Sequence, residues 1–99
     1  MLRFAQALMA HKLLNAENTS LLITGKVDAG DGAMYAYGFE DAREKDGSGW
    51  VGHSGGAPGM NGDLRIFPKS GYVVAVLSNL DPPAASEISA FVSVRLPKH

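Results

Sequence analysis

The sequence has no cysteine, no long apolar run and almost no net charge. Without cysteine the chain forms no disulfide bond and no thiolate metal site, and its redox compartment is left undetermined. The longest apolar run, Val73–Leu77, is far shorter than the roughly 20 residues that a membrane-spanning helix needs. The first residues also lack the charged segment, apolar core and cleavage site of a signal peptide, so the sequence predicts no localisation.

The charged and metal-binding side chains are scattered along the chain. The net charge is −1, and no basic patch indicates a nucleic acid or a membrane surface as a partner. His11, His53 and His99 do not have the spacing of metal ligands, and Asp28 and Asp31 lack the acidic ladder of a calcium loop. The sequence therefore predicts no metal and no cofactor.

The composition is that of one ordinary globular domain. The chain has 99 residues, of which 45% are hydrophobic, which suffices for one modest core. Apolar side chains recur at helical spacing over residues 2–14, and Asn15 can cap a second helix that runs to about Ile23. We therefore expect helices over about residues 2–24, followed by a glycine-rich and aspartate-rich loop over residues 25–33.

Alternating apolar residues predict four strands between about residues 34 and 79. The first strand would place Tyr35, Tyr37 and Phe39 on one face, which most often is the core side of a strand. The last strand, "YVVAVLSN", is apolar on both faces, as a covered central strand would be.

A final helix is expected over about residues 82–96, with Asp81 as its cap and Pro82 in its first turn. The predicted fold class is α+β: a four-stranded antiparallel meander, flanked by the N-terminal helices and one C-terminal helix.

Residues 52–59, "GHSGGAPG", combine histidine, serine and glycine in a way that suggests catalysis. They fit the G-x-S-x-G pattern of a nucleophile elbow, but an elbow needs a following helix, and here another strand follows. A trypsin-type site would need a histidine and an aspartate on two larger barrels. Because neighbours on a strand point to opposite faces, the His53 imidazole cannot readily reach the Ser54 hydroxyl. A plain glycine loop with a surface histidine remains an alternative.

The order of segments across residues 35–80 is more informative than this octet alone. "YAYGF", then "WVGHSGGAPGM", then "DLRIFPKSGYVVAVLSN" resembles the C-terminal part of the serine β-lactamase and penicillin-binding-protein superfamily. The similarity is greatest to the class C β-lactamase and related esterase branch, and it extends over about residues 2–95. The resemblance implies a partial β-lactamase-like fold.

The resemblance also implies roles for four residues of the octet. His53, Ser54 and Gly55 match the third family motif, on an edge strand that lines the catalytic cleft. Gly56 matches the position whose backbone N–H forms half of the oxyanion hole. His53 would face substrate or a catalytic tyrosine, and Ser54 would hydrogen-bond substrate instead of attacking it. The implied ligand is a small ester, lactam or peptide.

Two other family motifs are missing from this sequence. The nucleophile motif Ser-x-x-Lys is not found at any serine, and Tyr-x-Asn is not found at any tyrosine. In family members both motifs precede the third one. We therefore expect a segment that resembles the last third of a hydrolase and that is inactive alone.

Two other functions remain open. One is a self-associating structural or ligand-binding module without catalysis. The other is a weak esterase that uses Ser54 with His53 or with a histidine of another subunit. In the family, the strand that corresponds to residues 72–79 has further strand neighbours. The sequence therefore predicts a homo-oligomer that forms through an exposed strand edge or apolar face.

Overall fold

The chain folds as an α+β structure, and the computed structural model describes residues 1–30 and 32–97. Within these residues the helices are α1 (Leu2–Met9), α2 (Ala16–Ile23) and α3 (Ala84–Ser93). No helix in these ranges is long and apolar enough to cross a membrane. The strands are β1 (Val27–Gly30), β2 (Ala33–Tyr35), β3 (Glu40–Asp41), β4 (Val51–Ala57), β5 (Met60–Phe67) and β6 (Tyr72–Ser78).

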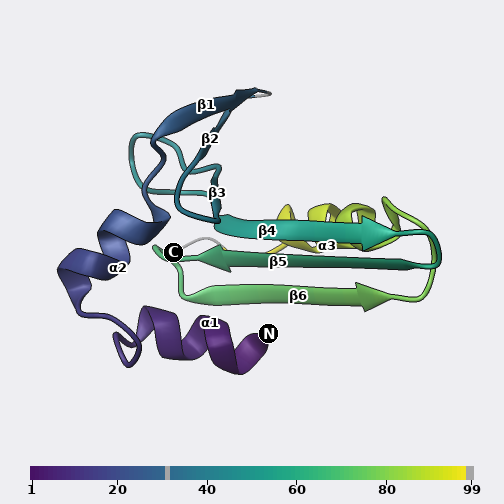
Figure 1. Cartoon of the computed structure of the whole chain (residues 1–99), viewed down its shortest axis with the longest axis horizontal. Coiled ribbons are helices and arrows are strands. Elements are labelled where there is room, and N and C mark those ends of the chain that lie inside the picture. The colour runs from purple at the N-terminus through teal and green to yellow at the C-terminus, as the bar shows by residue number, and fades with distance from the viewer. Residues whose placement is uncertain (31, 98–99) are drawn as a thin grey trace.

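The strands form one antiparallel sheet in chain order, from β1 to β6, so the predicted meander is confirmed (Figure 1). The described residues contain six strands instead of four. One added strand, β1, lies in the segment that was expected to be a loop, and it pairs with β2 through the backbone. The strand expected at residues 34–39 is divided into β2 and β3 by a turn, in which Ala36 N–H donates to Phe39 O.

The turn between β2 and β3 overturns the expected aromatic face. Gly38 has a φ of +83°, which L side chains rarely adopt, and it reverses the chain there. Phe39 is buried in the core, whereas the Tyr37 side chain is 58% exposed. Tyr35, Tyr37 and Phe39 therefore do not share one face of a strand.

The two N-terminal helices differ from their expected bounds at only one point. The first helix ends at Met9 instead of residue 14, and His11 follows in the left-handed region with a φ of +57°. The second helix is capped as expected, because the Asn15 side chain accepts a hydrogen bond of 2.8 Å from Asn18 N–H.

The core lies between α1 and one end of the sheet. Val51, Ile66 and Val73 are aligned across β4, β5 and β6, so their side chains share a face. Ala5 and Leu8 of α1 pack on that face, and all of these except Val73 are almost completely buried. The apolar stripe of α1 therefore covers only the end of the sheet where β4 begins.

The C-terminal helix α3 covers the other face of the sheet, and it lies behind β4 and β5 in Figure 1. It begins at Ala84, two residues later than expected. Asp81 does not cap it, because the Asp81 carboxylate accepts a hydrogen bond from Gly59 N–H. The Asn61 side chain, from β5, instead accepts the N–H groups of Ala85 and Ser86 at the start of α3.

Candidate cleft wall on strand β4

Strand β4 carries most of the glycine-rich octet, and it loses one neighbour partway along. It pairs with β5 over its whole length, but with β3 only at Val51 and Gly52. From His53 onward one edge of β4 has no strand partner within the part of the chain that the structure describes. Residues 53–60 are all exposed. The octet therefore lies at an open edge, on the half of the sheet that α1 does not cover.

The side chains of His53 and Ser54 point to opposite faces of the sheet. His53 is paired with Leu64 of β5, whereas Ser54 is paired with Asp63. Leu64 belongs to the same core cluster as α1, so His53 shares the face of α1. The imidazole Nδ1 lies 2.5 Å from the backbone oxygen of Ser54. It contacts the Ser54 backbone, and the expectation that these two side chains form no dyad agrees with this geometry.

The Tyr35 side chain also contacts His53, although the alternating pattern predicts it on the core side of a strand. Its hydroxyl lies 3.2 Å from His53 Nε2, and the two rings meet edge to face at 5.8 Å. A backbone carbonyl only accepts, so in the neutral ring Nδ1 carries the hydrogen and Nε2 accepts from the Tyr35 O–H. The phenol thus fixes the orientation of the imidazole on the open face.

No spacing in the sequence indicates the contact between Tyr35 and His53. The two residues are 18 positions apart and lie on strands that are not adjacent, since β3 runs between β2 and β4. Because β3 is only two residues long, the Tyr35 side chain reaches His53 past its end.

The peptide between Gly55 and Gly56 is held from one side. Asn61 Nδ2 donates a hydrogen bond of 2.8 Å to Gly55 O. In a trans peptide the C=O and N–H point in opposite directions, so the Gly56 N–H is directed away from β5 and toward the open edge. The Trp50 carbonyl accepts from Ala42 N–H on that same side. The backbone groups of every second residue in a strand point to the same edge, so the N–H of Gly56 points to the same edge as the Trp50 carbonyl.

The two central glycines of the octet have different surroundings. A Cβ on Gly56 would overlap Cγ of Pro82 and crowd the Asn61 amide, so the close packing of the α3 side requires glycine there. A Cβ on Gly55 would meet nothing within 4 Å, because that position faces the open half of the sheet.

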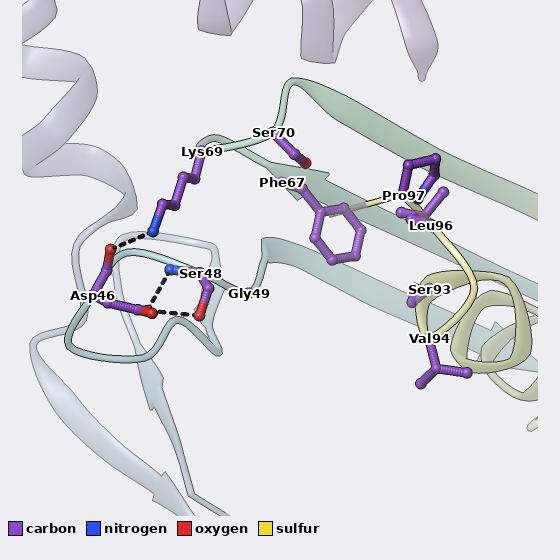
Figure 2. A pocket seen from close by; sticks show the side chains of 10 residues that line it. All are labelled: Asp46, Ser48, Gly49, Phe67, Lys69, Ser70, Ser93, Val94, Leu96 and Pro97. Carbon is purple, nitrogen blue, oxygen red and sulfur yellow. Dashed lines mark hydrogen bonds between the residues drawn. The ribbon is translucent and has the colours of Figure 1, made fainter. Parts of the chain in front are cut away.

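One cavity lies away from the octet, between the loop before β4 and the end of α3 (Figure 2). Its volume is about 420 Å³, and Figure 2 shows Phe67, Leu96 and Pro97 across the opening from Asp46 and Lys69. Hydrogen bonds from the Ser48 hydroxyl and N–H lower the pKa of the Asp46 carboxyl. Lys69 Nζ donates to the backbone oxygen of Asp46.

A second cavity, of about 390 Å³, lies between α1 and the turn that joins β5 to β6. No residue of the octet lines either cavity. The predicted cleft wall is thus an exposed face in this chain by itself. Across residues 1–30 and 32–97, no three His, Cys, Asp or Glu side chains are grouped as metal ligands.

An ion pair between Asp41 and Arg43 holds β3 in place beside β4. Asp41 accepts hydrogen bonds from Arg43 Nε at 2.8 Å and from Gly25 N–H at 2.9 Å. Burial acts to raise the pKa of the Asp41 carboxyl, but the hydrogen bonds from Arg43 and Gly25 outweigh it, and the pKa is lowered. The carboxylate therefore joins β3 to the segment that follows α2.

Comparison with known proteins identifies a family and a structurally similar protein. A family model described as Beta-lactamase matches residues 1–97. Among curated proteins no significant sequence match was found. The crystal structure of a penicillin-binding protein from Bacillus halodurans matches 97% of this chain with a TM-score of 0.87 and 27% identity. This chain spans only 29% of that protein. Because the family model matches nearly all of its residues, the chain belongs to the β-lactamase family.

Proposed function

We propose that this chain is the C-terminal, cleft-wall segment of a serine β-lactamase-like hydrolase that acts on esters, lactams or D-alanyl peptides. The observation that carries the proposal is the Gly56 N–H, which is directed toward an open strand edge. A backbone donor in that position can stabilise the negative oxygen that develops during acyl transfer.

The neighbouring side chains have distinct roles in this proposal. The His53 imidazole, held by Tyr35, presents a polar group to the substrate on the face that α1 leaves open. The Ser54 hydroxyl, on the opposite face, hydrogen-bonds substrate at the strand edge. Gly55 adds no side chain, so a ligand can approach the backbone closely.

The attacking group is not among these residues. No serine of the chain has lysine three positions later. The imidazole nearest to Ser54 is occupied by the Ser54 backbone and by Tyr35. We therefore expect no turnover from this chain alone, and we assign the nucleophile to a part of the hydrolase outside these 99 residues.

The test extends the reading frame upstream of the Met1 codon and assays the longer polypeptide. The proposal expects a Ser-x-x-Lys motif there and covalent labelling of its serine by a fluorescent penicillin. Replacing Gly56 by proline removes the N–H and should lower turnover by about 100- to 1,000-fold relative to Gly56→Ala, which intrudes similarly but keeps the donor. An in-frame stop codon without that motif, or equal turnover of the two variants, would contradict the proposal.

A further inference from the structure

We propose that Asn61 is a positioning residue, which fixes and polarises the peptide that carries the Gly56 N–H. The catalytic role of Asn61 rests on the proposed function, whereas its hydrogen bonds to the backbone do not. Asn61 is only 5% exposed, and both ends of its amide have backbone partners.

The orientation of the Asn61 amide is dictated by these partners. Ala85 N–H can only donate, so the atom 2.7 Å from it is Oδ1. Gly55 O can only accept, so the atom 2.8 Å from it is Nδ2. A flipped amide would place donor against donor and acceptor against acceptor, which a buried group does not tolerate.

The hydrogen bonds form a continuous chain that ends at the open edge. The N–H groups of Ala85 and Ser86 donate to Asn61 Oδ1, and Asn61 Nδ2 donates to Gly55 O. Hydrogen bonds in such chains polarise one another, and a carbonyl that accepts makes the N–H of its own peptide a better donor. The Gly56 N–H is that donor.

The contacts around Gly56 indicate that the peptide is held in one position. Pro82 and the Asn61 amide fill the space where a side chain at Gly56 would lie. Asn61 thus connects three segments: the octet, β5 and the start of α3. A residue that served only to cap α3 would need an acceptor, whereas Asn61 also supplies a donor to the octet.

The experiment separates these two roles with Asn61→Asp in the 99-residue chain, labelled with ¹³C and ¹⁵N for NMR. Aspartate keeps the acceptor for α3 but loses the donor to Gly55 O whenever the carboxyl is ionised. We expect the carbonyl carbon of Gly55 and the amide proton of Gly56 to shift upfield in the ionised variant. On acidification the carboxyl O–H can donate to Gly55 O, so both resonances should return toward their wild-type positions.

The matched control is Asn79→Asp, the same chemical change at an exposed asparagine near the end of β6. It should leave the Gly55 and Gly56 resonances at their wild-type positions. Resonances of α3 should stay helical in both variants. Gly55 and Gly56 signals that are equal in wild type and ionised Asn61→Asp, or that do not respond to pH in that variant, would overturn the proposal.

A second measurement decides the case in which Asn61→Asp fails to fold. In the unchanged chain, a scalar coupling across the hydrogen bond should connect Asn61 Nδ2 with the Gly55 carbonyl carbon. Its presence supports the positioning role, and its absence overturns it. These NMR readouts need no substrate, so they test the role of Asn61 separately from the hydrolase activity. The positioning role can therefore hold while the proposed function fails, and it can fail while the proposed function holds.

Discussion

On the face that α1 packs against, strands β4, β5 and β6 are core at one end and open surface at the other. Where β4 begins, Val51 and Ile66 are 0% and 1% exposed beneath α1. Where β4 ends, Met60 is 58% and Leu77 is 78% exposed. The register is unbroken between the two ends, so the difference does not arise from a change in strand pairing.

The difference between the two ends lies in what covers them and in their side chains. The covered end has branched apolar residues against a short amphipathic helix, and the open end has glycines and small residues around His53. Stability is therefore expected to reside in the covered end, while the open end keeps backbone groups accessible.

The largest effect is expected from a leucine in the covered half. Leu8→Ala removes a side chain that is 1% exposed and should lower the free energy of unfolding by about 2–5 kcal/mol. Leu77→Ala, the same change at the open end, should alter it by less than about 0.5 kcal/mol. Urea denaturation followed by circular dichroism measures both. Similar losses for the two variants would show that both ends of the sheet contribute equally to stability.

We propose that the open end also makes the isolated chain self-associate. The β6 edge and the exposed Leu77 side chain favour pairing with a second copy. Replacing Leu77 by aspartate should remove about 1.5–3 kcal/mol of apolar burial from such an interface and weaken it by tenfold or more. Sedimentation equilibrium at micromolar concentration measures this. Leu21→Asp, at an exposed leucine of α2, is the control that should change nothing. A wild-type chain that stays monomeric would rule out this association.

The two glycines of the octet should respond differently to the same added methyl group. Gly56→Ala places a Cβ against Pro82 and should cost about 1–3 kcal/mol of folding free energy, because the packed α3 side must shift. Gly55→Ala meets open space and should be neutral or slightly stabilising. Thermal unfolding of the pair measures the contrast. If Gly55→Ala destabilises the chain more than Gly56→Ala does, the face of β4 that Gly55 occupies is not the open one.

The smallest effect concerns pH and the anchor of β3. The folded pKa of Asp41 is lowered from its ordinary value of 3.8, so the unfolded chain binds the proton more readily. The contribution of Asp41 is therefore present above about pH 4 and is lost as the pH falls through the folded pKa. It should stay below about 1 kcal/mol, because solvent screens this partly exposed ion pair. Unfolding free energies between pH 6 and 3 should depend less on pH in Asp41→Asn than in wild type. Parallel pH profiles would contradict the assignment.

Sequence patterns predicted the fold class, the meander, the cap at Asn15 and the family resemblance, because these depend on short-range periodicity and on segment order. They missed β1, whose glycine and aspartate residues pair only through the backbone. They also assigned the cap of α3 to the adjacent Asp81. The actual cap, Asn61, lies 24 residues before the N–H that it accepts, and only the folded sheet brings it there.

The candidate site was predicted in part. The sequence indicated His53, Ser54, Gly55 and Gly56, and the structure places them at one open strand edge. Tyr35 and Asn61, which contact that edge, carried no signal, because contacts across several strands leave no fixed spacing in the chain. The functional roles assigned to all of these residues remain predictions.

The most direct test of the central claim is a mass measurement on the pure 99-residue chain after exposure to a fluorophosphonate and a fluorescent penicillin. The proposed cleft wall has backbone donors and no attacking group, so the intact mass should not change, and Ser54→Ala should behave as wild type does. A covalent adduct on Ser54 that disappears in Ser54→Ala would instead identify Ser54 as a nucleophile of this chain.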